Sequence, residues 1–246
     1  MDGKKAFTFA LLITLLLASN VYLIKNLQSE EIRKVVVTRV IDGDTIKIEG
    51  NLTLRLININ TPEKNSPGFE QAKEFLKQYE NKFVQVEELG KDKYKRTLAR
   101  VYTPDYLNLE IVKEGLATKF LVRESELDVF SEAEKSAIEN EKGIWKKSRY
   151  FNCLVSEINA KKEEVLLESN CGVMNIENWW LRDESRKKYK FPRLELTEVK
   201  LHTFNGNDTS ADLFWNQKSE IWNDDRDSIY IFDAENNLVQ YETYGY

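Results

Sequence analysis

Residues 40–63 read VIDGDTIKIEGNLTLRLININTPE. The stretch begins with an Asp-Gly turn that carries a further carboxylate, Asp44, continues through a strand-like run with one arginine, Arg55, and ends at Glu63. Metal-assisted attack of water on a phosphodiester needs a cation site, a guanidinium for the phosphoryl oxygens and a base for the water. Two carboxylates and an arginine on adjacent short strands and turns can supply these three parts. The stretch therefore predicts phosphoryl chemistry.

The surrounding sequence predicts a small barrel. Runs rich in β-branched and aliphatic residues, separated by tight turns, are expected as strands at 35–41, 45–48, 52–59, 83–86 and 97–102. Apolar residues at helical spacing predict helices at 70–80, 107–114 and 131–142. Five short strands with helices between and after them are typical of an α+β domain built on a five-stranded OB-type barrel. Periodicity alone leaves a generic α+β domain as the alternative.

The sequence pattern changes after Trp145, from mixed helices and strands to strands alone. No long amphipathic helix is evident there, and strand-like runs recur between turn clusters at 155–158, 165–168, 179–181, 193–204, 212–215 and 228–232. This spacing predicts an all-β, immunoglobulin-like sandwich. With a boundary near 147–151, the chain divides into an N-terminal segment (1–30), a barrel domain (31–150) and a sandwich domain (151–246).

Composition narrows the possible mechanisms. The chain has 246 residues, a net charge of −5 and a single histidine, His202. A net acidic chain lacks the overall basic footprint of many nucleic-acid-binding proteins, so attraction to phosphate must come from local arginines, lysines and a bound cation. His202 lies far downstream of the motif, where we expect a structural or solvated role. A general base in the first half of the chain must then be a carboxylate.

The N-terminal segment predicts a membrane anchor. Ala6 to Ile24 is long and apolar enough to span a bilayer as a helix, and Lys4 and Lys5 before it favour an orientation with the N-terminus inside and both domains outside. A cleaved signal peptide, which would make the protein secreted, is the alternative. Its small-residue cleavage signature is poor here, because leucines fill the position that should be small.

Two cysteines, Cys153 and Cys171, flank two strand-like runs joined by a short turn. An antiparallel hairpin would bring both to its open end. A disulfide suits an exterior location, whereas two unrelated buried thiols are the alternative.

Four motifs in the first domain occur in a recognisable order: Val40-Ile41-Asp42-Gly43-Asp44-Thr45, Arg55-Leu56, Thr61-Pro62-Glu63 and Asp92-Lys93-Tyr94-Lys95-Arg96-Thr97-Leu98-Ala99. Over about residues 35–145 this series resembles the staphylococcal (micrococcal, thermonuclease-like) nuclease family. The resemblance implies an OB-type barrel and calcium-dependent hydrolysis of phosphodiester bonds in DNA and RNA, with little sequence preference.

The resemblance also implies a role for each motif residue. Asp44 would bind Ca²⁺, and the backbone carbonyl of Thr61 would supply a second oxygen to the metal. Glu63 would act as the general base toward the attacking water, or orient that water. Arg55 and Arg96 would bind the phosphoryl oxygens as negative charge builds on them. Taken singly, each of these residues could also be an ordinary turn, helix-start, strand or surface charge.

The chain departs from the family pattern at four positions. Asn60 stands where the family usually has a second calcium-binding aspartate; its amide oxygen can still bind the metal, with one negative charge fewer. Lys95 replaces a glycine before the second arginine. Leu121 and Arg123 stand where the family has two tyrosines that help seat the nucleotide.

The second domain resembles a lamin-tail domain over about residues 152–245. The resemblance rests on Cys153 to Asn159, Trp179 to Asp183, Tyr189 to Pro192, Asp212 to Trp215, Ile221 to Asp224 and Ser228 to Asp233. It implies a binding or positioning role without catalysis. We expect the tryptophans of this region to be core residues, with stacking on a sugar or a base as the alternative.

The sequence thus predicts a monomeric, membrane-anchored, calcium-dependent nuclease that cleaves exposed, single-stranded or loosened nucleic acid. Two alternatives remain at this point. One is a catalytically weakened barrel that binds nucleic acid. The other is a surface adhesion protein in which the sandwich binds a cell-surface ligand.

Overall fold

The computed structural model describes residues 13, 14, 16, 19 and 32–246. Apart from those four helical positions, the predicted membrane segment from Ala6 to Ile24 lies outside the described residues. Within the described part of the chain, no helix has the length and apolar character needed to cross a membrane.

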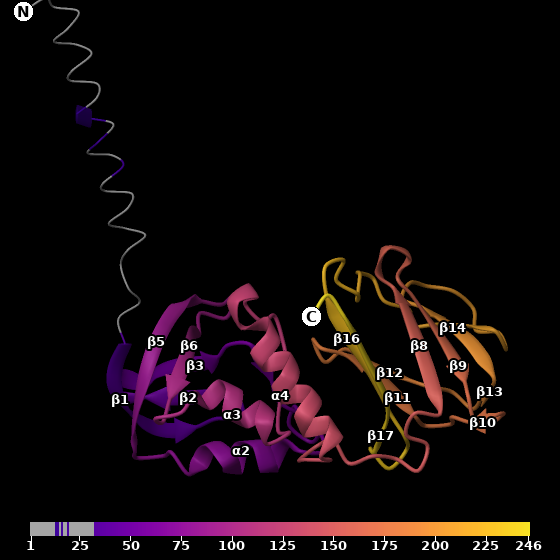
Figure 1. The fold of residues 1–246 in the computed structure, drawn as a ribbon, viewed down its shortest axis with the longest axis horizontal. Helices are drawn as coiled ribbons and strands as arrows, with labels where there is room; N and C mark the ends of the chain where they lie inside the picture. The colour runs from indigo at the N-terminus through magenta and orange to yellow at the C-terminus, as the bar shows by residue number, and fades with distance from the viewer. Residues whose placement is uncertain (1–12, 15, 17–18, 20–31) are drawn as a thin grey trace, which may run out of the picture.

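Five strands of the first domain close into a barrel in the order β1-β2-β3-β6-β5 (Figure 1). Side chains of β6 alternate between buried and half-buried along the strand, the period-two pattern that a barrel wall requires. Together with its helices, this barrel confirms the predicted OB-type architecture. The strands are β1 (Ile32–Val40), β2 (Thr45–Ile48), β3 (Leu52–Leu56), β5 (Phe83–Lys91) and β6 (Thr97–Tyr102).

Three helices accompany the barrel: α2 (Phe69–Lys77), α3 (Leu107–Lys113) and α4 (Leu127–Glu139). Helix α2 buries Phe69, Ala72 and Leu76, the i, i+3, i+7 stripe that predicted it. Helix α4 begins four residues before the predicted start and buries Phe130 and Ala133 on its inner face. Short 3₁₀ turns lie at Glu49–Asn51 and Glu124–Glu126.

The third predicted strand, 52–59, is interrupted in the structure. Strand β3 ends at Leu56, and Asn58 has a φ of 67°, a left-handed conformation that asparagine tolerates and that lies outside the extended region of a strand. The next strand, β4 (Ile59–Asn60), has only two residues and pairs with β7 (Thr118–Lys119) instead of with a barrel strand. This break turns the chain back, so that Asn60 and Thr61 lie against the Asp44 turn.

The second domain is β-rich, as predicted, with two four-stranded sheets in the orders β12-β11-β16-β17 and β15-β14-β9-β8 and a small β10-β13 pair. The prediction missed β10, β12 and β17, and the expected 193–204 run is two short strands. The strands are β8 (Leu154–Asn159), β9 (Glu164–Ser169), β10 (Met174–Asn175), β11 (Trp180–Asp183), β12 (Lys188–Lys190), β13 (Glu195–Leu196), β14 (Glu198–His202), β15 (Asp212–Phe214), β16 (Asp227–Phe232) and β17 (Leu238–Tyr244). A short 3₁₀ turn spans Ala160–Lys162.

The side chains singled out in this domain are mostly structural. Trp179, Trp215 and Trp222 are buried in its core. His202 stacks on Phe214 and contacts the carboxylates of Asp212 and Glu164, within the second domain. Cys153 and Cys171 form a disulfide at the open end of the β8–β9 hairpin.

The two domains meet along α4 and β16, which lie side by side in Figure 1. Trp145, fully buried, stacks with Phe232 of the second domain and packs against the tilted ring of Tyr230. Lys119 Nζ lies 2.6 Å from Glu134 Oε2 and donates to Ser228 Oγ at 3.0 Å. The Tyr230 hydroxyl donates to Glu134 Oε1 at 2.9 Å. The contact is thus a packed interior with a satisfied ion pair.

Candidate active site

The Asp44 turn is held close to the rest of the site by a glycine. A Cβ added to Gly43 would lie 2.6 Å from Ala72 Cβ and 2.8 Å from Thr61 Oγ1, closer than carbon atoms tolerate. Only glycine therefore lets α2 and Thr61 approach the turn this closely. The approach places the buried carboxylate of Asp44 directly against Thr61.

Asp44 is buried and stays charged because its oxygens are well partnered. Its Oδ2 accepts from the Thr61 amide and hydroxyl, each at 3.2 Å, and its Oδ1 accepts from Thr45 Oγ1 at 2.9 Å. Burial alone would raise the pKa of Asp44, but the charges of Arg55 and Arg186 and these hydrogen bonds outweigh it and leave the pKa below its usual value.

Arg55 is fixed in a single orientation. On β3 it pairs in register with Thr45 of β2 and Leu98 of β6. Its NH2 group donates to the Ile59 carbonyl and to Asn60 Oδ1, each at 2.7 Å, and lies 3.2 Å from Asp44 Oδ2; its NH1 donates to the Leu56 carbonyl. The guanidinium therefore needs no reorganisation to present positive charge here.

Arg96 is positioned by the turn before β6. Its Nε donates to Asp92 Oδ2 at 2.7 Å, and its NH1 donates to Thr45 Oγ1 at 3.5 Å, which directs it toward the Asp44 side of the barrel. Lys95 has a φ of 65°, the left-handed conformation for which glycine is favoured. The turn therefore keeps a left-handed conformation although a lysine stands where the family has a glycine.

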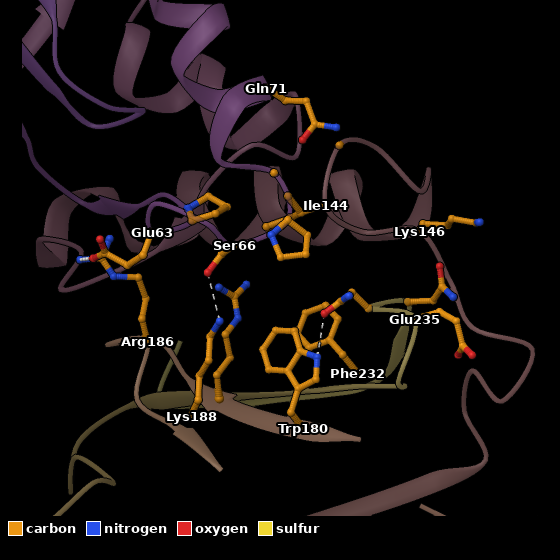
Figure 2. Close-up of a pocket in the computed structure, with 17 residues that line it drawn as sticks. Glu63, Ser66, Gln71, Ile144, Lys146, Trp180, Arg186, Lys188, Phe232 and Glu235 are labelled. Carbon is orange, nitrogen blue, oxygen red and sulfur yellow. Dashed lines mark hydrogen bonds and ion pairs between the residues drawn. The ribbon is translucent and has the colours of Figure 1, made fainter. Parts of the chain in front are cut away.

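Glu63 is well exposed, with 64% of its side chain accessible, and it pairs with a residue of the other domain. Arg186 NH2 lies 2.8 Å from Glu63 Oε1, and Figure 2 shows the arginine pointing toward the glutamate across the domain boundary. A cavity of about 380 Å³ lies beside this pair between the domains, bordered by Trp180 and Lys188.

Arg186 touches two more of the predicted site residues. Its NH1 donates to the Thr61 carbonyl at 2.9 Å and lies 3.6 Å from Asp44 Oδ2. Asn60, also buried, donates from Nδ2 to the Glu184 carbonyl at 2.9 Å, two residues before Arg186. The second domain thus forms one wall of the site.

A larger cavity, of about 700 Å³, contains the two predicted phosphate-binding arginines. Residues of both domains line it, among them Arg55, Asn60, Tyr94, Arg96, Leu121, Arg123, Arg186 and Lys187. The structure therefore brings Asp44, Arg55, Asn60 and Thr61 into direct contact, with Arg96 on the same cavity and Glu63 joined to it through Arg186. Leu121 and Arg123, which stand where the family has two tyrosines, also line this cavity.

Two features of the site escaped the sequence reasoning. Tyr94 is 67% exposed, and the Arg96 guanidinium lies 5.5 Å from its ring centre, so it offers an aromatic face beside Arg96. Its place in the motif 92–99 could have revealed it. Arg186 and Lys187 carry no motif and lie in the other domain, and no sequence signal points to them.

The oxygen atoms of the site are of the chemical types that bind calcium, but in this structure they contact arginine side chains. Calcium prefers carboxylate, carbonyl and amide oxygens. Asn60 Oδ1 accepts from Arg55, the Thr61 carbonyl accepts from Arg186, and Asp44 Oδ2 contacts both guanidiniums. Among the described residues, no group of three or more His, Cys, Asp or Glu side chains could hold a metal ion. As arranged, these residues do not form a calcium site.

The barrel and its pairing of fixed guanidiniums with carboxylates define the class of protein as an OB-barrel phosphodiester hydrolase. A family model described as "Staphylococcal nuclease homologue" matches residues 53–147. The chain is 30% identical over 115 residues to an "Uncharacterized endonuclease" of Escherichia coli O157:H7, covering 44% of this chain and 74% of that protein. It is 32% identical over 124 residues to "Micrococcal nuclease" of Shigella flexneri, covering 44% of this chain and 71% of that protein. This chain belongs to the staphylococcal nuclease family, and its first domain is a nuclease domain.

A further relative shows how much of a related protein's length this chain matches. The chain is 34% identical over 115 residues to an "Uncharacterized endonuclease" of Haemophilus influenzae, covering 44% of this chain and 64% of that protein. The matched part is thus just under two thirds of that relative's length. The family match ends at residue 147 and leaves the second domain outside it.

Proposed function

We propose that the whole protein is a calcium-dependent nuclease that hydrolyses phosphodiester bonds of DNA or RNA with low sequence specificity. The observation that carries the proposal is the 700 Å³ cavity, where Arg55 and Arg96 face one space beside the Asp44–Thr61 contact. Two guanidiniums on one cavity suit the bidentate binding of phosphoryl oxygens. The calcium dependence rests on the family resemblance and not on a formed metal site, because Arg55 and Arg186 contact the oxygens that a calcium ion would need.

The residues of the chain divide the reaction between them. Arg55 and Arg96 bind the phosphoryl oxygens and stabilise the charge that accumulates on them during attack. Glu63, accessible to solvent, accepts the proton of the attacking water while the water oxygen forms its bond to phosphorus. The bond between phosphorus and the leaving oxygen breaks, and that oxygen takes a proton from solvent.

The surroundings of the cavity favour a flexible, single-stranded or locally opened substrate. The exposed ring of Tyr94 offers a stacking surface to any base, and Arg123 and Lys187 add positive charge along the same cavity. Contacts of this kind hold a backbone and a base face and read no base edges, which supports low sequence specificity.

We also propose that the protein works outside the cytoplasm, as a monomer held at the membrane by its N-terminal segment, or secreted if that segment is cleaved. The disulfide between Cys153 and Cys171 supports this location, because such bonds persist in oxidising compartments. The second domain would be a lamin-tail-like module that positions the nuclease or binds a surface ligand. Its two four-stranded sheets suit that assignment.

The test follows cleavage of single-stranded DNA by the full chain with and without millimolar calcium. We expect calcium-dependent cleavage, which Glu63→Gln should lower by at least a hundredfold because the base is removed while the side-chain shape is kept. Glu235→Gln, an exposed glutamate on the neighbouring interdomain cavity, serves as the matched control and should cleave normally. A parent protein that is folded and binds DNA without cleaving it would instead be a nucleic-acid-binding module.

A further inference from the structure

An arginine of the second domain is buried with unused hydrogen-bond donors. Arg182 lies on β11 and is 5% exposed, and its Nε and NH2 atoms have no hydrogen-bond partner among the described residues. The guanidinium packs over the rings of Trp145, Tyr230 and Phe232, 5.1–5.8 Å from their centres. Aromatic faces stabilise the charge but give its N–H groups no oxygen acceptor. Because a buried charge without such acceptors is costly, an anion beside Arg182 would stabilise it.

A second cation lies directly opposite this arginine. Lys188 of β12 is in register with Arg182, so the two side chains project from the same face of the sheet. Like charges directly opposite each other destabilise a pair of strands. Burial, and then the charge of Arg182, lower the pKa of Lys188. An anion bound to both side chains would relieve this repulsion.

Both cations line the interdomain cavity of about 380 Å³, together with Arg186. Figure 2 shows Lys188 and Arg186 directed from the second domain toward Ser66 and Glu63 of the nuclease domain. Lys188 Nζ donates to Ser66 Oγ at 3.3 Å, and Arg186 is paired with Glu63. The charge of Glu63 is thus offset by Arg186, which leaves the positive charges of Arg182 and Lys188 in excess at this end of the cavity.

The facing wall of the cavity is the start of helix α2 in the nuclease domain. Residues 66–68 line the cavity, and Gly68 is the N-cap of the helix, without a side-chain hydrogen bond to cap it. The positive end of the helix dipole therefore lies at this wall and favours a bound anion. In Figure 2, Glu235 lies at the opposite end of the cavity from Lys188, so the cationic end is kept clear of its charge.

We propose that the interdomain cavity is a second phosphate-binding subsite, which holds a phosphodiester group of the substrate strand next to the one that is cleaved. The inference rests on the proposed nuclease function. Arg182 and Lys188 donate to the phosphoryl oxygens, and the phosphate relieves the repulsion between the two cations. Arg186 lines both this cavity and the 700 Å³ cavity, so one strand reaches both of them. The second domain then extends the nuclease site by a further nucleotide.

The first experiment measures binding of a fluorescently labelled, short single-stranded oligonucleotide to the full chain by anisotropy, in EDTA. Arg182→Met replaces the buried cation by an apolar side chain of similar length, a change that is often neutral or stabilising for the fold. We expect it to weaken binding at least tenfold without lowering the free energy of unfolding, and Lys188→Gln to weaken binding several-fold. Lys190→Gln is the matched control, because Lys190 is also an exposed lysine of β12 but lies outside the lining of the cavity. It should bind as the parent does.

The salt dependence of binding and the ends of the oligonucleotide identify the contact. Loss of one phosphate contact should reduce the slope of log K against log salt by about 0.7 in Arg182→Met and Lys188→Gln, and leave it unchanged in Lys190→Gln. An internal phosphodiester predicts the same loss of affinity for oligonucleotides with and without a terminal phosphate. A loss confined to the terminally phosphorylated oligonucleotide would overturn the internal placement and assign the cavity to the end of a strand.

Two results would show that the cavity is not a subsite. One is unchanged affinity and salt slope in a folded Lys188→Gln protein, which decides the question even if Arg182→Met does not fold. The other is an Arg182→Met protein that is less stable but binds as the parent does, because Arg182 is then only structural. Absence of oligonucleotide binding by the parent also overturns the subsite. A parent that binds the oligonucleotide but does not cleave it with millimolar calcium overturns the proposed function alone.

Discussion

Asn60 shows how a single residue serves both domains. Its Oδ1 accepts from Arg55, and its Nδ2 donates to the Glu184 carbonyl of the second domain. An aspartate could make the first contact but not the second, because a carboxylate has no donor. The docked second domain therefore gives the Asn60 amide a partner that an aspartate at this position could not use.

Because Asn60 makes both contacts, we expect Asn60→Asp to strengthen calcium binding and to destabilise the fold. The variant adds a charged oxygen beside Asp44 and should strengthen calcium binding. It also removes a buried hydrogen bond to the Glu184 carbonyl, which should lower the free energy of unfolding by about 1–3 kcal/mol. Calcium titration and urea unfolding measure the two effects. Asn140→Asp is the control, since the Asn140 amide also donates to a backbone carbonyl, that of Ser136, but on the surface; a similar loss of stability there would contradict the explanation.

At the residue scale, the sequence predicted the site residues of the first domain but none of those in the second domain. Asp44, Arg55, Asn60 and Thr61 lie close in sequence on paired strands and turns, so local pairing brings them together. Arg186 is 125 positions from Thr61, and its approach depends on how two folded domains dock. No periodicity or motif encodes that docking, which is why the arginine could not be foreseen.

At the element scale, tight turns made the barrel strands predictable, whereas backbone conformation decided where they stop. The 52–59 run looks continuous because its aliphatic residues extend through Ile59, yet Asn58 ends the strand by taking a positive φ. In the second domain, Leu238–Tyr244 contains the polar residues Gln240, Glu242 and Thr243, and its role as an edge strand beside β16 emerges only from pairing.

The β8–β9 hairpin carries the disulfide, and its removal should be measurable. Cys153 and Cys171 are separated by 18 positions, so the bond closes a short loop of the unfolded chain. We expect the Cys153→Ser/Cys171→Ser double variant to lose about 3 kcal/mol of unfolding free energy. Urea unfolding with and without reductant checks this. The parent should shift toward the variant when reduced, whereas a parent insensitive to reductant would mean that the bond contributes little.

At the scale of the whole molecule, the domain interface contains a carboxyl group that resists ionisation. Burial, and then the charge of Asp227, raise the pKa of Glu184 from 4.5 to about 8, although the Tyr246 hydroxyl donates to it. The folded protein therefore keeps a proton that the unfolded chain releases above its lower pKa. Stability from this group is complete below pH 4.5 and is lost progressively as the pH rises to about 8.

Glu184→Gln should remove this dependence, because the amide cannot ionise and still accepts from Tyr246. Each unit of pH between about 5 and 8 should lower the unfolding free energy of the parent, relative to the variant, by about 1.4 kcal/mol. Denaturant unfolding at several pH values measures the difference. A parallel pair of curves would show that Glu184 ionises normally in the folded protein. Asp227, whose pKa burial raises to about 6, is present in both proteins, so its own titration contributes to both curves.

The segment between the domains lies along the β17 edge of the β12-β11-β16-β17 sheet. The Leu238 amide donates to the Lys146 carbonyl, and the Ser148 amide donates to the Leu238 carbonyl, directly after the buried Trp145. A protease that nicked the chain in this segment would therefore leave two halves that stay associated, through Trp145 against Tyr230 and through the enclosed Lys119–Glu134 pair. Such a nicked protein would keep Arg186 at the nuclease site, and the covalent connection between the domains would be dispensable once they have folded together.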